Sequence, residues 1–258
     1  MDEIEGVLLD IDGVLVVSWE QIPGAAESVR WLRAQGIPFR LITNTTTHSR
    51  HELATTLRDA GVDVAGEEVV TAVVMTGAYL RSHHPGAKVF LLSDGDPTDD
   101  LPEVQLVDEG ADVVVIGGAG TDFGYERLNR AFGMLMDGAA LVGMHRNMYW
   151  RTKEGLQLDG GAFIVGLEEA TGRKAVICGK PSPTFFHETA GMVGTSVERT
   201  AMVGDDIVND VLGAQAAGLV GILVRTGKFM PTDLDTASNE PDHVIDSIAD
   251  LPRTLRPS

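Results

Sequence analysis

Short apolar runs rich in β-branched residues alternate with helix-like segments along most of this chain. The clearest pairs of a run and its helical segment are 7–11 with 25–35, 37–43 with 49–60, and 200–206 with 209–217. Strands separated by helices pair in parallel, because the helix carries the chain back to the edge where the first strand began. The sequence therefore predicts an α/β fold with a Rossmann-like, doubly wound parallel sheet.

A second set of strands in the middle of the chain predicts an inserted domain. Apolar runs at 87–93 and 111–118 are each followed by a polar or helical stretch. Turn signals bracket this region, Pro85-Gly86 on one side and Gly179-Lys180-Pro181 on the other. We therefore expect a core formed by residues 1–81 and 179–258, with an inserted α/β cap domain at 82–178.

The charge of the chain excludes several classes of partner. Twenty basic against 38 acidic residues give a net charge of −18, which repels nucleic acid and anionic membranes. An anionic small molecule would need a local cation, a metal or a helix N-terminus. The single cysteine, Cys178, allows no internal disulfide and is typical of a reducing compartment. With an acidic start and no apolar run of ~18 residues, the chain is expected to be cytoplasmic and not to bind membranes.

Two carboxylates one residue apart interrupt the first apolar run. Asp10 and Asp12 would share one face if the strand continued through both, and Gly13 suggests where it ends. Ligands of open parallel sheets bind beyond the carboxyl ends of the strands. The pair is therefore a candidate functional site, and a turn cap with one solvated acid is the structural alternative.

Polar residues at two further turns are suited to bind an anion. Thr43, Asn44 and Thr45 offer hydroxyls and backbone N–H groups before a helix, although threonines there are also common caps and turn formers. Lys180 lies between a glycine and a proline that stiffen its backbone, and is suited to neutralise a phosphoryl group. The alternative for Lys180 is an ordinary surface lysine.

A later apolar run also ends in acids. Asp205 follows Gly204 directly, and Asp206 and Asp210 come next. With the first acid pair, Asp205 would form an oxygen-rich site suited to Mg²⁺, which takes one or two carboxylates and keeps several waters. Acids that complement a helix dipole are the alternative, which explains Asp206 better than Asp205.

The order of these signals, an acid pair, a threonine, a lysine and an acid at successive strand ends, resembles the haloacid dehalogenase-like hydrolase superfamily. In halide-releasing members the second acid of the first motif is replaced, so the resemblance implies phosphoryl transfer here. The long insertion resembles the subgroup with a large α/β (type II, C2) cap. The four matching motifs are Asp10-Ile-Asp12-Gly13-Val, Ile42-Thr43-Asn44, Gly179-Lys180-Pro181 and Gly204-Asp205-Asp206-(three residues)-Asp210.

The resemblance implies a phosphatase that hydrolyses small phosphorylated compounds through an aspartyl phosphate. Asp10 would be the nucleophile, and Asp12 would be the general acid that protonates the leaving group and then the base that activates water. The residues expected to bind the phosphoryl group are Thr43, Asn44, Thr45 and Lys180, of which Thr43 and Lys180 also count as catalytic.

The resemblance also implies a Mg²⁺ cofactor. The carboxylates of Asp10 and Asp205 and the backbone carbonyl of Asp12 would hold the metal, while Asp206 or Asp210 would order its waters. Caps of this kind further imply a homodimer formed through the cap.

Within the expected cap, the segments 122–129, 145–150 and 155–161 resemble the branch that contains phospholysine phosphohistidine inorganic pyrophosphate phosphatase. The pair Tyr149-Trp150 stands where those relatives often carry two tyrosines, and Arg146 stands where they carry lysine, so the substrate is left open. His145, Arg146, Tyr149 and Trp150 suit either a phosphate ester or a cap interface. A phosphatase of P–N bonds or pyrophosphate stays an alternative, as does a non-catalytic protein that binds phosphometabolites.

Three other signals are weaker. Gly117-Gly118-Ala-Gly120 lacks the full spacing of a dinucleotide-binding loop, and we interpret it as a turn after a strand. His48 and His51 have helical spacing without an adjacent third metal ligand, so an exposed pair is expected. Cys178 has no obvious base nearby and is expected to be a small buried residue.

Overall fold

The computed structural model describes residues 4–152 and 155–255, which form two compact units. The core unit comprises the chain up to Thr43, the segment Arg50–Val70 and the chain from Lys180 onward. The inserted unit comprises Asn44–Ser49 and Thr71–Gly179. The functional boundaries of a cap at 82 and 178 stay a prediction.

The core unit is built on one six-stranded sheet. Its strands are β1 (Gly6–Asp10), β4 (Phe39–Thr43), β5 (Val69–Thr71), β13 (Thr200–Gly204), β14 (Val220–Val224) and β15 (His243–Ile245). They lie in the order β15-β14-β13-β1-β4-β5, and the pairs β1–β4, β1–β13, β13–β14 and β14–β15 are parallel. Because the chain extends the sheet from β1 to both sides, β1 and β13 flank the switch point. The predicted doubly wound α/β fold is confirmed.

The helices of the core unit occupy most of the positions that the sequence predicts. The predicted helix at 25–35 is α1, and that at 49–60 is α2. Gly24 precedes α1 and adopts a left-handed backbone conformation (φ 89°), which glycine tolerates best. The helices are α1 (Ala25–Gln35), α2 (Arg50–Asp59), α6 (Pro183–Val193), the π-helix η4 (Ile207–Leu212), α7 (Gly213–Ala216), α8 (Pro231–Thr236) and α9 (Leu251–Thr254), with 3₁₀ turns η1 (Gly66–Glu68), η3 (Val197–Arg199) and η5 (Ile248–Asp250).

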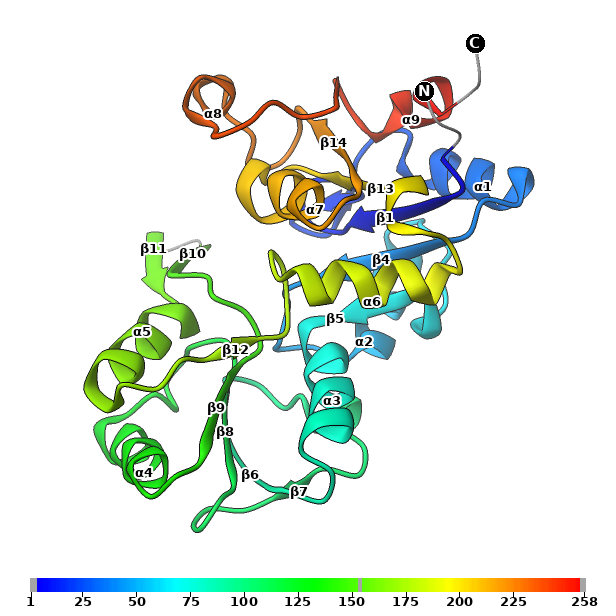
Figure 1. Ribbon diagram of the computed structural model, residues 1–258. Helices are drawn as coiled ribbons and strands as arrows, with labels where there is room; N and C mark the ends of the chain where they lie inside the picture. Colours follow the sequence, from blue (N-terminus) through cyan, green and yellow to red (C-terminus); the bar gives the residue numbers. More distant parts are fainter. Residues whose placement is uncertain (1–3, 153–154, 256–258) are drawn as a thin grey trace. The chain divides into compact units, whose positions relative to one another are not determined.

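Both faces of the core sheet are covered, so its strands are apolar without alternation. On one face, Val7 and Leu9 of β1 pack in a buried cluster with Val29 and Leu32 of α1. Leu8 points to the opposite face, where α6 contacts β1 and β4 (Figure 1). A small hairpin of β2 (Val16–Val17) and β3 (Glu20–Gln21) follows β1.

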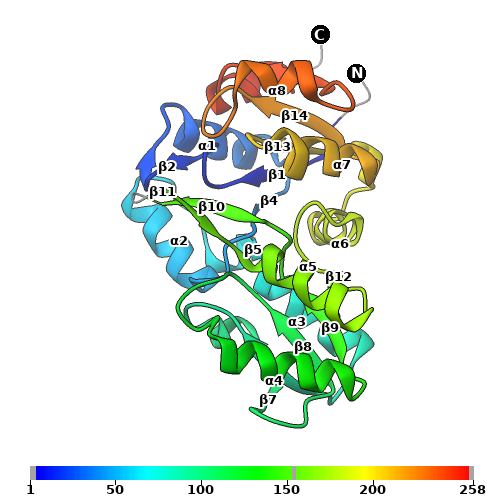
Figure 2. The same cartoon turned by 90° about the vertical axis from the view of Figure 1, so that its left-hand side faces the viewer.

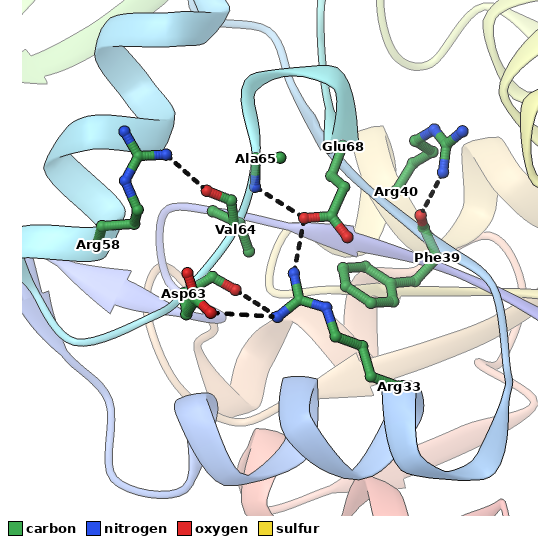
Figure 3. A network of polar contacts seen from close by, with 8 residues as sticks. All are labelled: Arg33, Phe39, Arg40, Arg58, Asp63, Val64, Ala65 and Glu68. Atoms are coloured by element: carbon green, nitrogen blue, oxygen red, sulfur yellow. Dashed lines mark hydrogen bonds and ion pairs between the residues drawn. The ribbon is translucent and has the colours of Figure 1, made fainter.

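A polar network fixes the amino end of the core sheet (Figure 3). Arg33, near the end of α1, donates to the Asp63 carbonyl (2.6 Å) and to Glu68 Oε2 (2.7 Å). The same Glu68 oxygen accepts from the Ala65 N–H (2.8 Å), and the Arg33 guanidinium lies over the ring of Phe39 (5.4 Å). The network thus joins α1, the start of β4 and the chain that leads into β5.

The inserted unit has its own parallel sheet. Its strands β6 (Lys88–Leu92), β7 (Gln105–Leu106), β8 (Val113–Ile116), β9 (Ala140–Gly143) and β12 (Val176–Ile177) lie in the order β12-β9-β8-β6-β7, and their pairs are parallel. In Figures 1 and 2, α4 (Tyr125–Met136) and α5 (Gly160–Thr171) cover one face of this sheet and α3 (Ala72–His83) covers the other. The unit also contains η2 (Thr98–Asp100) and an antiparallel hairpin of β10 (Tyr149–Thr152) and β11 (Gly155–Leu158). In the part of the chain that the structure describes, no helix is long and apolar enough to span a bilayer.

Candidate active site

Asp10 is the last residue of β1 and lies at the carboxyl edge of the core sheet. It stands opposite Ile42 of β4, and its side chain is buried. The strand does not continue to Asp12, because the chain turns after Asp10 and the Gly13 N–H donates to the Val16 carbonyl (2.7 Å). Asp10 and Asp12 therefore do not share a strand face, which the sequence predicts only for a strand that continues through both residues.

Asp12 is exposed on the turn that follows β1. Its pKa is raised, first by loss of hydration and second by the negative charge of Asp10, while the Lys228 ammonium acts in the opposite direction. A carboxyl group with a raised pKa holds its proton more readily, which suits a proton donor.

Asp205 follows β13 at once, so its carboxylate lies beside the end of β1 in the adjacent strand. The side chain is 1% exposed, and its Oδ2 accepts from the backbone N–H of Lys228 (2.6 Å). Its buried Oδ1 has no hydrogen-bond donor among the described residues. A buried carboxylate oxygen without a donor is costly unless a cation satisfies it.

The π-helix η4 places Asp210. Asp206 precedes the helix, and its Oδ1 accepts from the N–H groups of Val208 (3.0 Å) and Asn209 (2.9 Å), as expected of an acid at a helix start. The Val211 N–H donates to the Asp206 carbonyl five residues back (3.3 Å), which is the wide turn of a π-helix. Asp210 is thereby buried and its Oδ2 accepts from the Asp206 N–H (3.2 Å). That Asp206 also orders metal-bound water stays a prediction.

Lys180 lies between two of these carboxylates. Its Nζ is 2.6 Å from Asp10 Oδ1 and 2.7 Å from Asp210 Oδ1, and its side chain is 4% exposed. Burial lowers the pKa of this ammonium, but the negative charges of Asp10 and Asp210 outweigh burial and raise it. Lys180 is therefore a buried, charged member of the cluster and not an ordinary surface lysine.

The three buried carboxylates fit a divalent cation. Asp10, Asp205 and Asp210 each present an oxygen within 4.8 Å of the others. Burial raises the pKa of Asp205 to about 8, with repulsion from Asp10 and Asp210 adding to the shift. Burial likewise raises the pKa of Asp210 to about 6, against the opposing charge of Lys180. The all-oxygen donor set and the unsatisfied Asp205 Oδ1 match what Mg²⁺ requires.

The predicted phosphate-binding residues divide between the two units. Thr43 ends β4 one residue after the neighbour of Asp10, and it is 7% exposed. Asn44 and Thr45 belong to the inserted unit, together with Thr46, whose Oγ1 accepts from the Gly118 N–H (3.1 Å). The role of Thr43, Asn44 and Thr45 toward a phosphoryl group stays a prediction.

The aromatic and basic residues of the inserted unit lie in different environments. His145 is buried, with Nε2 3.9 Å from Asp159 Oδ2. Arg146 forms a two-pronged ion pair with the buried Glu168. Tyr149 and Trp150 are exposed on β10. His145 and Arg146 are thus engaged within the unit itself.

The residues for which the sequence analysis expected no functional role lie in the environments it predicted. Gly117 and Gly118 begin the turn after β8. His48 and His51 are exposed. Cys178 is buried, and burial raises the pKa of its thiol to about 12, so it is not an activated nucleophile.

Sequence reasoning missed the loop after β14. Lys228 binds Asp205 through its backbone, and the Thr226 hydroxyl donates to the Gly13 carbonyl (2.5 Å). Because β14 is the neighbour of β13, its carboxyl end belongs to the same edge of the sheet. The sequence signal that could have identified this loop is the end of the apolar run of β14, followed by Thr226-Gly227-Lys228.

Comparisons with known proteins match the chain over nearly its whole length. Sequence models of haloacid dehalogenase-like hydrolases and of HAD-hydrolase-like proteins match residues 7–107 and 177–251. Haloacid dehalogenase-like hydrolase domain-containing protein 2 of Bos taurus is 38% identical over 252 residues, which cover 95% of this chain and 96% of that protein. Phospholysine phosphohistidine inorganic pyrophosphate phosphatase of Mus musculus is 35% identical over 253 residues, covering 96% and 92%. The crystal structure of 4-nitrophenylphosphatase from Thermotoga maritima superposes with a TM-score of 0.92 at 32% identity, covering 98% of both chains.

A parallel α/β core with buried carboxylates around one lysine, together with an inserted α/β sheet, defines a phosphatase-type hydrolase. The chain belongs to the haloacid dehalogenase-like hydrolases, in the subgroup of phosphatases with a large α/β cap. The family resemblance that the four motifs predict is confirmed.

Proposed function

We propose that this protein is a Mg²⁺-dependent phosphatase that hydrolyses small phosphorylated compounds through an aspartyl phosphate on Asp10. The observation that carries the proposal is the cluster of Asp10, Asp205 and Asp210 at the switch point of the sheet, with Lys180 paired to Asp10 and Asp210. Four charged groups that different segments of the chain bring together are the arrangement that phosphoryl transfer needs, because it depends on positioning and charge stabilisation.

Asp10 attacks phosphorus in the first displacement. The Lys180 ammonium holds Asp10 Oδ1 at 2.6 Å and so fixes the orientation of the carboxylate. The same positive charge reduces the repulsion between Asp10 and an incoming phosphate. The attack forms the bond from Asp10 to phosphorus and breaks the bond from phosphorus to the leaving group.

Asp12 moves the protons. In its protonated form it gives a proton to the leaving group, and as a carboxylate it then takes a proton from the water that hydrolyses the aspartyl phosphate. Its exposed position on the turn and its raised pKa support both steps.

Asp10 and Asp205 would hold Mg²⁺, together with the predicted backbone carbonyl of Asp12. Asp210 lies beside them, and its carboxylate, already engaged with Lys180 and the Asp206 N–H, would order the waters of the metal. Bound there, the ion would neutralise charge on the phosphoryl oxygens. Thr43, Asn44 and Thr45 would bind those oxygens through their hydroxyl and amide groups.

A second candidate substrate class is supported by the relatives. The 35% identity to the mouse phospholysine phosphohistidine inorganic pyrophosphate phosphatase favours P–N bonds or pyrophosphate as alternatives to phosphate esters. Asp10 would serve all three classes, and only the leaving group differs.

The test is a substrate panel that contains 4-nitrophenyl phosphate, sugar phosphates, phospholysine, phosphohistidine and pyrophosphate, each with Mg²⁺ and with EDTA. We expect turnover of at least one class that depends on Mg²⁺. The substrate with the highest kcat/KM assigns the leaving group. Turnover unaffected by EDTA, or ligand binding without any turnover, would contradict the proposed function.

A homodimer formed through the inserted unit is a further part of the proposal. The hairpin β10–β11 supports it, because Tyr149, Leu156 and Leu158 are exposed and lie on one face by the strand register. Sedimentation of the wild type and of a Tyr149→Ser, Leu158→Ser double variant would test it. We expect the wild type to sediment as a dimer and the double variant as a monomer; a monomeric wild type contradicts the proposal.

A further inference from the structure

The loop after β14 contacts the active site at two points. The Thr226 hydroxyl donates to the Gly13 carbonyl, directly beyond the turn that carries Asp12. The Lys228 N–H donates to Asp205 Oδ2 (2.6 Å). The approach requires glycine on both sides, because a Cβ at Gly13 or at Gly227 would lie 2.0 or 2.1 Å from Asp205 Oδ2. The loop is therefore part of the site's architecture.

The side chain of Lys228 lies in the field of the cluster. Its ammonium is stabilised by the negative charges of Asp10, Asp205, Asp210 and Asp206, which outweigh partial loss of hydration and raise its pKa. Its positive charge also opposes the rise in the pKa of Asp12. Together with its backbone contact to Asp205, this places Lys228 beside the carboxylates of the site.

Lys228 differs from Lys180 in how its charge is used. Lys180 is buried and bound to two carboxylates. Lys228 is exposed, and its ammonium forms no ion pair with any residue that the structure describes. One cation is thus committed to the protein, while the other faces solvent with its hydrogen-bond donors available to a ligand.

We propose that Lys228 is a second phosphate-binding cation of the active site, which contacts substrate from the solvent side while its backbone orients Asp205. This inference rests on the proposed phosphatase function and adds a residue to it. The chain carries a net charge of −18, so an anion approaching three buried carboxylates gains from an accessible positive charge. Lys228 supplies that charge at the same edge of the sheet.

The inference predicts opposite effects on anion and cation binding. Removing the ammonium in Lys228→Met weakens the attraction for phosphate and removes repulsion against Mg²⁺. With 4-nitrophenyl phosphate as substrate, we expect the Michaelis constant and the inhibition constant for inorganic phosphate to rise about tenfold, with a smaller change in kcat. We expect Mg²⁺, titrated by calorimetry without substrate, to bind as tightly as in the wild type or more tightly.

Two further variants separate charge from structure. Lys228→Arg keeps the charge and should restore phosphate binding to within about threefold of the wild type. Arg225→Met removes a positive charge three residues away that is paired with Asp246, and should leave both affinities unchanged. Equal effects of Arg225→Met and Lys228→Met would show that only the net charge matters, and would overturn the inference.

A structural role alone would give a different result. If Lys228 only supported Asp205, Lys228→Met would weaken Mg²⁺ and phosphate together. That result, or unchanged phosphate binding, overturns the inference about Lys228. It does not contradict the phosphatase function, provided that the wild type turns over a substrate. A wild type that turns over no substrate of the panel contradicts the phosphatase function itself, whatever Lys228 binds.

Discussion

The two ends of the core sheet carry similar charged groups, but only at the amino end do the opposite charges neutralise one another. At the amino end, the Arg33 guanidinium is matched by Glu68 and by the Asp63 carbonyl, and these side chains are partly exposed (Figure 3). At the carboxyl end, three buried carboxylates lie close together and one buried lysine pairs with two of them. The first arrangement satisfies its own charges, whereas the second leaves negative charge that needs a cation.

This difference separates stability from function within one sheet. The network at the amino end joins α1, β4 and the chain leading into β5, and its charges are neutralised without a ligand. The carboxyl end raises the pKa of Asp205 to about 8 through burial and through repulsion by Asp10 and Asp210. Groups that destabilise one another in this way are characteristic of sites that bind or react.

The largest expected effect comes from the nucleophile. Asp10→Asn keeps the shape of the side chain but removes the attacking carboxylate, so we expect kcat for 4-nitrophenyl phosphate to fall by at least about 10⁴-fold. Asp246→Asn, which removes an exposed carboxylate from the same unit, should retain activity. Normal turnover by Asp10→Asn would show that Asp10 is not the nucleophile and that the carboxyl end of the sheet does not carry the activity in this way.

The next effect is on stability as a function of pH. The pKa of Asp205 is raised to about 8 in the folded protein, against about 3.9 in an unfolded chain. Between these values the folded state holds a proton that the unfolded state releases, so this group lowers the free energy of unfolding as pH rises. Asp210, with a pKa raised to about 6, acts in the same direction over a narrower range.

Thermal unfolding at pH 5 and pH 8 measures this effect. Mg²⁺ binds the deprotonated carboxylates, so it should raise Tm more at pH 8 than at pH 5. At a Mg²⁺ concentration of 100 Kd, the free energy of unfolding at pH 8 should rise by about 2.7 kcal/mol. Asp205→Asn should lose most of the Mg²⁺ shift and part of the pH dependence. A Mg²⁺ shift that is equal at both pH values, or one that survives in Asp205→Asn, would contradict a metal site at these carboxylates.

The smallest effect belongs to the amino end. Arg33→Met removes the hydrogen bonds to Glu68 and to the Asp63 carbonyl, and we expect it to lower the free energy of unfolding by about 1 kcal/mol. Arg30→Met, which breaks an exposed pair with Glu27, is the matched control and should change Tm little. Both variants should keep kcat/KM; a loss of activity in Arg33→Met alone would mean that the two ends are coupled.

Much of the core could be predicted from local sequence. The apolar run before Asp10 predicts β1, and the helix predicted at 25–35 has the bounds of α1. The strand-end rule also brought Asp10 and Asp205 to one place, because parallel strands end at a common edge. Lys180 joins them by its ion pair with Asp10, although the strand before it, β12, belongs to the sheet of the inserted unit. These features depend on periodicity and on strand order, which the sequence carries directly.

What could not be predicted depends on turns and on neighbours in space. Asp12 leaves the strand face because β1 ends at Asp10, which a run of apolar residues does not reveal. Only the family resemblance placed Asp210 near the metal, because the wide turn of η4 that brings it there has no clear sequence signal. Lys228 was missed because only the pairing of β13 with β14 brings its loop beside Asp205.

The central claim is that Asp10 accepts the phosphoryl group, and the direct measurement is the mapping of the phosphorylated residue. Asp12→Asn should slow the second displacement more than the first when the leaving group is 4-nitrophenolate, which needs little protonation, so the intermediate should accumulate. After acid quenching and proteolysis, mass spectrometry should find phosphate on Asp10, and none in the Asp10→Asn, Asp12→Asn double variant. Phosphate on another residue, or turnover without any phosphorylated residue, would contradict the account.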